Sequence, residues 1–485
     1  MLFNSVAYLI FLPITVALFW MIPAKWRASA LLLASYVFYM FWKPIYGVLI
    51  LALTAINYGF GFAIHRSEKN KGKWLFGALA TNLLVLGYFK YAFMTRDVLN
   101  DVFKSIGLHQ IPTISWEIIL PLGISFFVFE FIHYLVDIYR GEKPVKSFIE
   151  FALFPSFFPT QIAGPIKRYQ DFIPQLKFEH KLNIADFNQS MELIFFGLFK
   201  KVVLADMLGI MVTRCYAHPE MLSGADFWLA TWAFTFQVYF DFSGYTDIAR
   251  GSALLFGIKV PANFNLPYLS GSYSEFWKRW HITLSKWLKD YLYIPLGGSR
   301  QGEVRTCINL IITMTLGGLW HGAAPHFVVW GFYVGLLLVL HRTWRHVVAK
   351  SAQLEKIVET KVFHVFAVAL TFNAHALGLA IFRANNIPEG LLVLGKMFNL
   401  QPAAEGLANW QPAVMNTNGS IVYPILPLVL IAMWVMQIVC ANSKEKGGIM
   451  PNFFVGFKPA YLAVLIAMLL IFSPDVTPSF IYFQF

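Results

Sequence analysis

Apolar segments long enough to cross a lipid bilayer recur along the whole 485-residue chain. A membrane-spanning helix needs about 20 apolar residues, because all its backbone polar groups must be satisfied where water is absent. The sequence predicts such helices at 6–22, 28–42, 45–64, 74–94, 117–139, 187–212, 226–256, 304–322, 326–341, 361–382, 421–440 and 458–473. Only 13% of the residues are charged, against roughly a quarter in soluble chains. The chain is therefore predicted to be an all-α polytopic membrane protein with about 11–12 transmembrane helices.

The loops between these segments differ in charge. The basic loops are 24–27, 65–73, 140–146, 341–346 and 442–448, whereas 218–226 and 401–420 contain neither Lys nor Arg. Because cytoplasmic loops carry the excess of Lys and Arg, the basic group is expected to be cytoplasmic and the N-terminus extracytoplasmic. Lys43 is a lone exception to this charge pattern and does not change the predicted orientation. The start lacks a basic n-region and a cleavage site, so a retained first span is expected rather than a signal peptide.

The net charge of +12 would suggest nucleic acid as a partner if the chain were soluble. Here the basic residues lie in short loops, which predicts contact with membrane lipids and no nucleic acid partner. The pair Lys200–Lys201 is interpreted as snorkelling or lipid-contacting. Cys215, Cys307 and Cys440 are far apart and match no metal or redox motif. We therefore expect no metal site and no bound cofactor.

One segment, FALFPSFFPTQIAGPIKRY at 151–169, is apolar but contains Pro155, Pro159, Gly164 and Pro165. A continuous lipid-facing helix is incompatible with so many helix-breaking residues. Non-helical backbone at membrane depth occurs only where protein buries it or water lines it. The segment is predicted to be a re-entrant or cavity-lining piece, and a surface loop among the lipid headgroups is the alternative.

A second segment, GSYSEFWKRWHITLSKWLKDYLYIPLGG at 271–298, has Ser272 and Glu275 at capping-box spacing. On a helical wheel its large apolar side chains fill one arc and its charged side chains the opposite arc. This pattern predicts one in-plane interfacial helix with a basic polar face, ended by Pro295 and the two glycines that follow. His281 falls on the apolar arc and is expected to point away from cytoplasmic water.

Several polar residues are embedded in apolar surroundings. GGLWHGAAPHF carries His321 and His326 between two spans, and YFDFSGYTDIARG places Asp241, Ser243 and Tyr245 in or beside another. An ionisable residue in hydrocarbon is costly and therefore indicates a functional site by default. Asp241 and Tyr245 are four residues apart and share a helix face if the helix continues through them.

Each of these features also has a structural interpretation. A membrane histidine can serve only to bond a backbone carbonyl, and the glycines beside His321 can serve only close helix packing. Asp241 and Asp247 can pair with Arg250 or another cation and contribute only stability. The chain contains no G-x-S-x-G elbow, no P-loop and no H-E-x-x-H motif. Both interpretations therefore stay open on the residues alone.

The stretch SYSEFWKRWHITLSKWLKDYLYIPLGGSR, followed by TLGGLWHGA, resembles the signature of the membrane-bound O-acyltransferase family, in particular its bacterial alginate O-acetyltransferase type. FFPTQIAGPIKRYQDFIPQL, YFDFSGYTDIARG, NFNLPYLSGS and the N-terminal LIFLPITVALFW are similar to that subgroup too. The resemblance covers most of 1–60 and nearly all of 120–340, and beyond about residue 345 only apolar periodicity remains.

The resemblance implies a ring of tilted helices around a central chamber. It implies one membrane domain over 1–485, with N-terminal spans in 1–120, a catalytic core in 121–345 and C-terminal spans in 346–485. The family's catalytic histidine corresponds to His321, and its second polar position to His281. Substitution of either residue is expected to impair activity more than folding. We further expect the following residues to line the chamber: Asp241, Ser243, Tyr245, Gln161 and Trp320.

The function that the resemblance implies is transfer of acetyl from cytoplasmic acetyl-CoA across the bacterial inner membrane, for O-acetylation of a polysaccharide such as alginate or peptidoglycan. An esterase-like extracytoplasmic protein is the expected partner, docked on loops around 95–116, 213–226 and 400–420. Two alternatives are a transporter or flippase for a lipid-linked glycan, and an acyltransferase that uses a carrier-protein aminoacyl or lipid acyl-CoA donor.

The basic residues Lys278, Arg279 and Arg300 are expected to attract the phosphates of coenzyme A where it enters. The alternative is that they hold only anionic lipid.

Overall fold

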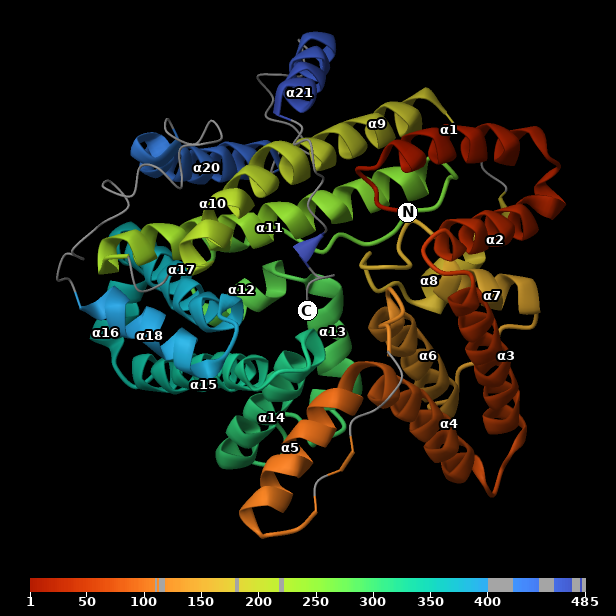
Figure 1. Cartoon of the computed structure of the whole chain (residues 1–485), viewed down its shortest axis with the longest axis horizontal. Helices are drawn as coiled ribbons and strands as arrows, with labels where there is room; N and C mark the ends of the chain where they lie inside the picture. The colour runs from red at the N-terminus through yellow and green to blue at the C-terminus, as the bar shows by residue number, and fades with distance from the viewer. Residues whose placement is uncertain are drawn as a thin grey trace. The chain divides into compact units, whose positions relative to one another are not determined.

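A computed structural model of the chain describes residues 1–109, 111–112, 118–178, 183–217, 222–399, 422–444, 458–472 and 480–481. Within these ranges all regular structure is helical and no strand occurs (Figure 1). The predicted all-α class is therefore confirmed. The described residues form two compact units, one with 1–194 and 245–262, the other with 195–244 and 263–481. We call them unit 1 and unit 2. The single domain over 1–485 and the ring around a chamber stay predictions.

The helices of unit 1 begin soon after the N-terminus, where the Ser5 hydroxyl accepts a hydrogen bond from the Tyr8 N–H and caps the first of them. They are α1 (Val6–Met21), α2 (Ala24–Met40), α3 (Ile45–Arg66), α4 (Lys71–Leu86), α5 (Ala92–Ser105), α6 (Ile124–Tyr139), α7 (Phe148–Ser156), α8 (Tyr169–Phe172) and most of α9 (Ile184–Leu198). A π-helical turn, Gly87–Tyr91, joins α4 to α5.

Two predicted helix ends in this unit were wrong by seven or more residues. The segment expected to be a loop from 95 is helical to Ser105, since α5 continues the preceding helix through its π-helical turn. The helix expected from 117 begins only at Ile124, because Pro121 precedes it and Gly123 adopts a left-handed φ of 72°. That φ favours glycine, which has no Cβ to clash.

The segment 151–169 is broken and buried. After α7 the chain makes turns without regular structure, and every side chain from 151 to 167 is buried. Lys167 ends this stretch, and its Nζ lies 2.9 Å from Glu130 Oε1 and faces the Phe154 ring. Protein contacts thus enclose the broken backbone, as the re-entrant prediction requires. The alternative of a surface loop among headgroups was wrong.

The helices of unit 2 carry the histidine motifs. They are α10 (Asp206–Ala217), α11 (Gly224–Leu254, in unit 1 from Tyr245 onward), α12 (Tyr273–Arg279), α13 (Ile282–Leu288), α14 (Glu303–His321), α15 (Pro325–Val348), α16 (Ala352–Val358), α17 (Lys361–Arg383), α18 (Ile387–Phe398), α20 (Val422–Lys444) and α21 (Lys458–Phe472). A π-helical turn, Phe199–Ala205, connects α9 to α10, and another, Lys289–Tyr293, follows α13.

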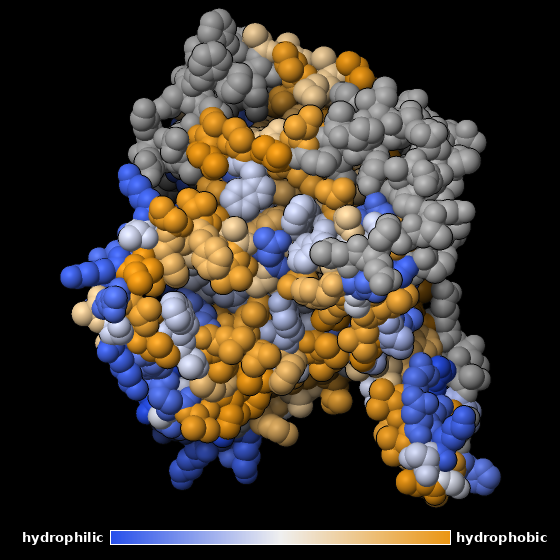
Figure 2. All heavy atoms as spheres, turned by 90° about the vertical axis from the view of Figure 1, so that its left-hand side faces the viewer, coloured by the Kyte–Doolittle hydropathy of each residue, from blue (hydrophilic) through white to orange (hydrophobic). Residues whose placement is uncertain are grey.

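A helix lies at every predicted apolar segment. Among the described residues, four helical stretches are long and apolar enough to cross a membrane, namely Ile45–Arg66, Lys71–Ser105, Pro325–Val348 and Lys361–Arg383. Many large apolar side chains on these helices face outward, such as Val48, Phe76, Phe332 and Val365. Figure 2 shows apolar side chains over much of the face in view. Such a surface is suited to hydrocarbon and would be unfavourable in water.

Helices α14 and α15 form a closely packed hairpin. A Cβ added at Gly318 would overlap the Phe327 carbonyl oxygen and lie 2.8 Å from the Gly331 Cα, and one added at Gly322 would overlap the Phe327 ring. These glycines therefore allow the two helices to approach, which is the structural interpretation of the motif. Phe327 occupies the space beside both glycines.

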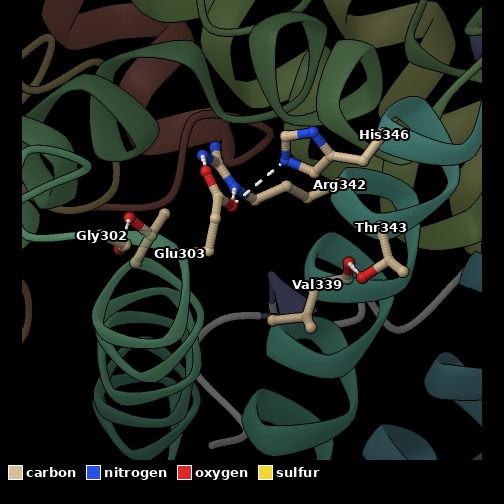
Figure 3. Close-up of polar contacts among 7 residues, drawn as sticks. Gly302, Glu303, Val339, Arg342, Thr343 and His346 are labelled. Atoms are coloured by element: carbon tan, nitrogen blue, oxygen red, sulfur yellow. Dashed lines mark hydrogen bonds and ion pairs between the residues drawn. The ribbon is translucent and has the colours of Figure 1, made fainter. Parts of the chain in front are cut away.

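Charged groups link α14 to α15 at the open end of this hairpin, where α14 begins. The Arg342 guanidinium donates from Nε and Nη2 to the two Glu303 carboxylate oxygens, each at 2.7 Å, and His346 Nε2 lies 3.2 Å from Glu303 Oε2 (Figure 3). The side chains of Arg342, His346 and Glu303 are 32%, 53% and 59% exposed, so their contribution to stability is small. They mark the end of α14 that lies opposite His321.

Replacing Gly318 with alanine is expected to destabilise the protein by about 1–3 kcal/mol, because the added methyl group forces α14 and α15 apart. Thermal unfolding of the purified full chain measures the loss. Gly395→Ala in α18 is the matched control, since a Cβ there meets nothing within 4 Å. A Gly318→Ala protein as stable as the Gly395→Ala protein would contradict the packing role.

Candidate functional site

The segment 271–298 contains two short helices rather than the single interfacial helix that its apolar arc predicts. The predicted start is confirmed, since the Ser272 hydroxyl accepts from the Glu275 N–H at 3.2 Å. Helix α12 ends at Arg279, and His281 then adopts a left-handed conformation with φ 40° and ψ 54° before α13 begins. A side chain in this conformation is strained, at a cost of order 1–3 kcal/mol, and persists only where its surroundings fix it.

Asn263 fixes the backbone at this break. Its carbonyl accepts from the Ile282 N–H at 2.9 Å, and its Oδ1 accepts from the Thr283 N–H at 3.2 Å and the Thr283 hydroxyl at 2.6 Å. Asn263 is fully buried. Sequence reasoning noted the motif NFNLPYLSGS but gave Asn263 no role. The available signal was an amide side chain in an otherwise apolar stretch, which needs a specific hydrogen-bond partner when buried.

Replacing Asn263 with alanine is expected to lower the free energy of unfolding by about 1–3 kcal/mol, because the buried Thr283 donors lose their acceptor. Thermal unfolding of the purified chain measures this loss. Asn263→Asp keeps an acceptor oxygen at the same place and should retain more of the stability than alanine does. Equal losses in the two variants would show that the hydrogen bonds to Thr283 do not hold the break.

His281 is completely buried, and its ring packs on Phe242 and Trp320 at centroid distances of 4.7 and 6.2 Å. Burial lowers the pKa of His281 from 6.5 to about 3, because the charged imidazolium loses its hydration. The ring is therefore neutral at pH 7. Neither ring nitrogen has a hydrogen-bond partner in another residue of the described chain. The expectation that His281 points away from water is confirmed.

His321 is the last residue of α14 and is 7% exposed. Its ring lies among Trp320, Trp330 and Phe382, at centroid distances of 4.9, 5.2 and 5.5 Å. Trp320 thus contacts the rings of both His281 and His321. The structure brings these three predicted residues together within unit 2, although they are some forty positions apart in the sequence.

The aromatic walls of this site were not predicted. Trp330 comes from α15 and Phe382 from α17, and sequence reasoning treated both as ordinary apolar positions. His326, grouped with His321 in the sequence, packs instead on Phe327 at a centroid distance of 4.1 Å. A stripe of aromatic residues on a helix does not indicate which partner it covers, so these contacts depend on tertiary structure.

Asp241 belongs to a buried charge network. Lys201 Nζ lies 2.8 Å from Asp241 Oδ1 and 2.5 Å from Asp206 Oδ1, and the Ile481 N–H donates to Asp241 Oδ2 at 2.9 Å. The interpretation of Lys200–Lys201 as a lipid-contacting pair was wrong, because Lys201 is buried between two carboxylates and Lys200 packs on the Phe196 ring. Asp241 thus has another cation as its partner, as the structural interpretation allowed.

The other predicted chamber residues lie in different places. Ser243 is buried in unit 2, and its hydroxyl has no hydrogen-bond partner among the described residues. Tyr245 belongs to unit 1, where its ring stacks on Phe3 at 4.5 Å. Gln161 also belongs to unit 1 and is buried there, with its carboxamide unpaired within the described chain. The structure therefore groups Ser243, but not Gln161 or Tyr245, in the unit of the histidines.

The three predicted donor-entry residues are not equivalent. Arg279 forms an ion pair with Glu275 at 2.7 Å, so its charge is already compensated. Lys278 and Arg300 are exposed, and neither forms an ion pair with a described residue. The electrostatic surface at this end of unit 2 thus depends on Lys278 and Arg300 more than on Arg279.

Comparison with known proteins identifies the family. Residues 88–368 match the membrane-bound O-acyltransferase family. A probable alginate O-acetylase of Pseudomonas putida is 35% identical over the full length of both chains. A second, from Pseudomonas syringae, is 39% identical over 86% of this chain and 77% of its own. A peptidoglycan O-acetyltransferase of Helicobacter pylori is 37% identical over 78% of this chain and 74% of its own. The chain therefore belongs to the membrane-bound O-acyltransferase family and is a multi-pass membrane enzyme that transfers acyl groups to hydroxyls.

Proposed function

We propose that this protein takes acetyl from cytoplasmic acetyl-CoA and delivers it for O-acetylation of a cell-envelope polysaccharide, either alginate-like or peptidoglycan. The observation that carries the proposal is the position of His321, buried at the end of α14 beside Trp320, with His281 on the same tryptophan. The relatives named for alginate and peptidoglycan acetylation support acetyl as the group transferred. We propose the bacterial inner membrane as the location.

The chemistry needs a base at neutral pH. A hydroxyl is a poor nucleophile, and a neutral imidazole can accept its proton while the hydroxyl oxygen attacks the thioester carbonyl. The new C–O bond forms, the C–S bond breaks, and the coenzyme A thiolate leaves and is protonated. The aromatic walls of Trp320, Trp330 and Phe382 exclude water, which protects the thioester from hydrolysis.

His281 contributes a second polar group to the same site. Its ring is neutral, and its nitrogens are free of partners in other described residues, so they are available to a substrate or a water molecule. Its strained backbone, held by Asn263, is consistent with a position that is fixed for function. Ser243 is the additional candidate for contact with substrate in this unit.

The donor enters from the cytoplasmic side in this proposal, since the positive-inside pattern assigns the basic loops to that face. The exposed guanidinium of Arg300 is our candidate for attracting the coenzyme A phosphates. Arg279 is not proposed for this role, because Glu275 already neutralises it.

The acetyl group leaves on the outer side through a second protein. The extracytoplasmic segments are too short for a sugar-binding domain, and the chain has no serine elbow to hold acetyl there. An esterase-like transferase with a nucleophilic hydroxyl is the proposed partner. Of the docking loops predicted around 95–116, 213–226 and 400–420, the first is helical to Ser105, and residues 113–117, 218–221 and 400–420 lie outside the described residues.

Vesicles that contain the purified chain, with acetyl-CoA inside and a soluble polysaccharide outside, test the whole proposal. Coenzyme A release is expected only when the partner protein is also present outside. Efficient acetylation of the polysaccharide without a second protein would contradict the relay. Export of a lipid-linked glycan without consumption of acetyl-CoA would instead favour a flippase. If the protein consumes an aminoacyl carrier protein or a long-chain acyl-CoA in preference to acetyl-CoA, that compound is the donor instead.

A further inference from the structure

A cavity of about 600 Å³ opens between α15, α16, α17 and the start of α12 in unit 2, a volume within the range of ligand pockets. Its walls are mainly aliphatic and aromatic, with Leu337, Leu340, Phe363, Phe366 and Leu370 among them. None of the residues assigned to the histidine site lines it. The cavity is therefore separate from the proposed catalytic residues.

The cavity is open to the surroundings on its apolar side. The side chains of Leu340, Phe366 and Leu370 line it and remain 55%, 60% and 58% exposed. These residues lie on α15 and α17, two of the helices that are long and apolar enough to cross a membrane. A hydrocarbon chain could enter the cavity sideways from the bilayer core without crossing a polar barrier.

Basic groups gather at one end of the cavity. His341 and Arg345 line it from α15, and Lys278 of α12 is close enough to His341 to interact with it electrostatically, as Arg345 does. Neither Lys278 nor Arg345 forms an ion pair within the described part of the chain. Glu355 also lines the cavity, but it lies beyond ion-pair distance of both. An uncompensated positive charge of this kind attracts an anionic headgroup.

We infer that this cavity binds an anionic phospholipid, with the acyl chains against Leu337, Leu340 and Leu370 and the phosphate near Lys278, His341 and Arg345. Trp344 lines the cavity next to the basic groups, and an indole at that level suits the boundary between headgroups and hydrocarbon. Basic pockets between transmembrane helices on the cytoplasmic side bind anionic lipid headgroups in the same manner.

The lipid fits this cavity better than the acyl donor does. The acyl group proposed for transfer has two carbons and the arm that carries it is polar, so neither would cover so much apolar wall. A phospholipid covers the apolar wall and the basic end together. In this inference Lys278 serves lipid rather than coenzyme A.

Native mass spectrometry of the purified full chain, titrated with phosphatidylglycerol or phosphatidylcholine, tests the assignment without any acyl transfer. Phosphatidylglycerol is expected to bind preferentially. Lys278→Gln and Arg345→Gln should each weaken its binding about fivefold, and the double variant about 25-fold. Ala367→Trp, which fills the cavity from α17, should reduce the binding of both lipids.

Arg342→Gln is the matched control, because it removes the same charge from the same helix but from a residue outside the cavity. It should leave the affinity for phosphatidylglycerol within twofold. Equal weakening by Arg342→Gln and Arg345→Gln, or equal binding of the two lipids by the unmodified chain, would overturn the site. So would a rise in the KM for acetyl-CoA in the double variant with lipid binding unchanged, since Lys278 and Arg345 would then serve the donor.

Discussion

A chain in which His321 is replaced by alanine is expected to lose acetyl transfer by a factor of roughly 10² to 10⁴, the range that a positioned general base contributes. The physical reason is that the substitution removes the proposed base, the imidazole of His321, from its place among Trp320, Trp330 and Phe382. Release of coenzyme A by reconstituted protein, normalised to the amount of folded enzyme, measures the effect.

A buried histidine elsewhere in unit 2 supplies the control. His375 of α17 is 1% exposed and packs on Phe276 and Trp280, so His375→Gln tests the general effect of altering a buried imidazole. It should leave transfer within about threefold once folded protein is normalised. Near-normal transfer by His321→Ala would rule out His321 as the base. An equal loss of transfer in both variants would show that the loss in His321→Ala comes from impaired folding.

Replacing Lys201 with methionine is expected to lower the free energy of unfolding by about 3–5 kcal/mol, because two buried carboxylates lose the cation between them. Lys201, Asp206 and Asp241 are each less than a tenth exposed, so water cannot compensate for the missing charge. The loss is measured as a lower thermal unfolding temperature and a smaller yield of folded protein.

The triple variant Lys201→Met, Asp206→Asn, Asp241→Asn removes the whole charge network and is expected to recover most of the lost stability. If it does so but transfers no acetyl, Asp241 has a chemical role in addition to its ion pair. If it recovers both, Asp241 is structural. A Lys201→Met protein with unchanged stability would show that Asp206 and Asp241 do not need a cation.

Helices could be located from the sequence because every membrane-spanning helix needs a similar length of apolar residues to cross the bilayer. Apolar length alone predicted both ends of α3 and α17 within two residues, and the start but not the end of α15. The boundary of α6 could not be predicted in this way, since it depends on the left-handed Gly123, and a hydropathy window does not report a backbone dihedral angle.

The site was predictable in part, for a different reason. His281 and His321 could be singled out because a titratable ring in apolar surroundings is costly and needs an explanation. The break before α13 was not predictable, since the wheel pattern of 271–298 is satisfied by a straight helix. The left-handed His281 is followed by residues whose donors Asn263 accepts, namely those of Ile282 and Thr283. Likewise, no local sequence pattern shows that Lys201 and Asp241, which are forty residues apart, form a buried ion pair.

The length of α14 separates His321 from the charged residues at the other end of the helix. Its 19 residues extend over roughly 28 Å, close to the thickness of about 30 Å of a bilayer's hydrocarbon core. Glu303, with its basic partners, stands at one end and His321 at the other. In the function proposed above, α14 lies across the bilayer, and acetyl would pass most of the permeability barrier before it meets His321. The bulky, charged part of the donor can stay on the side where it is made, and the membrane remains sealed to it.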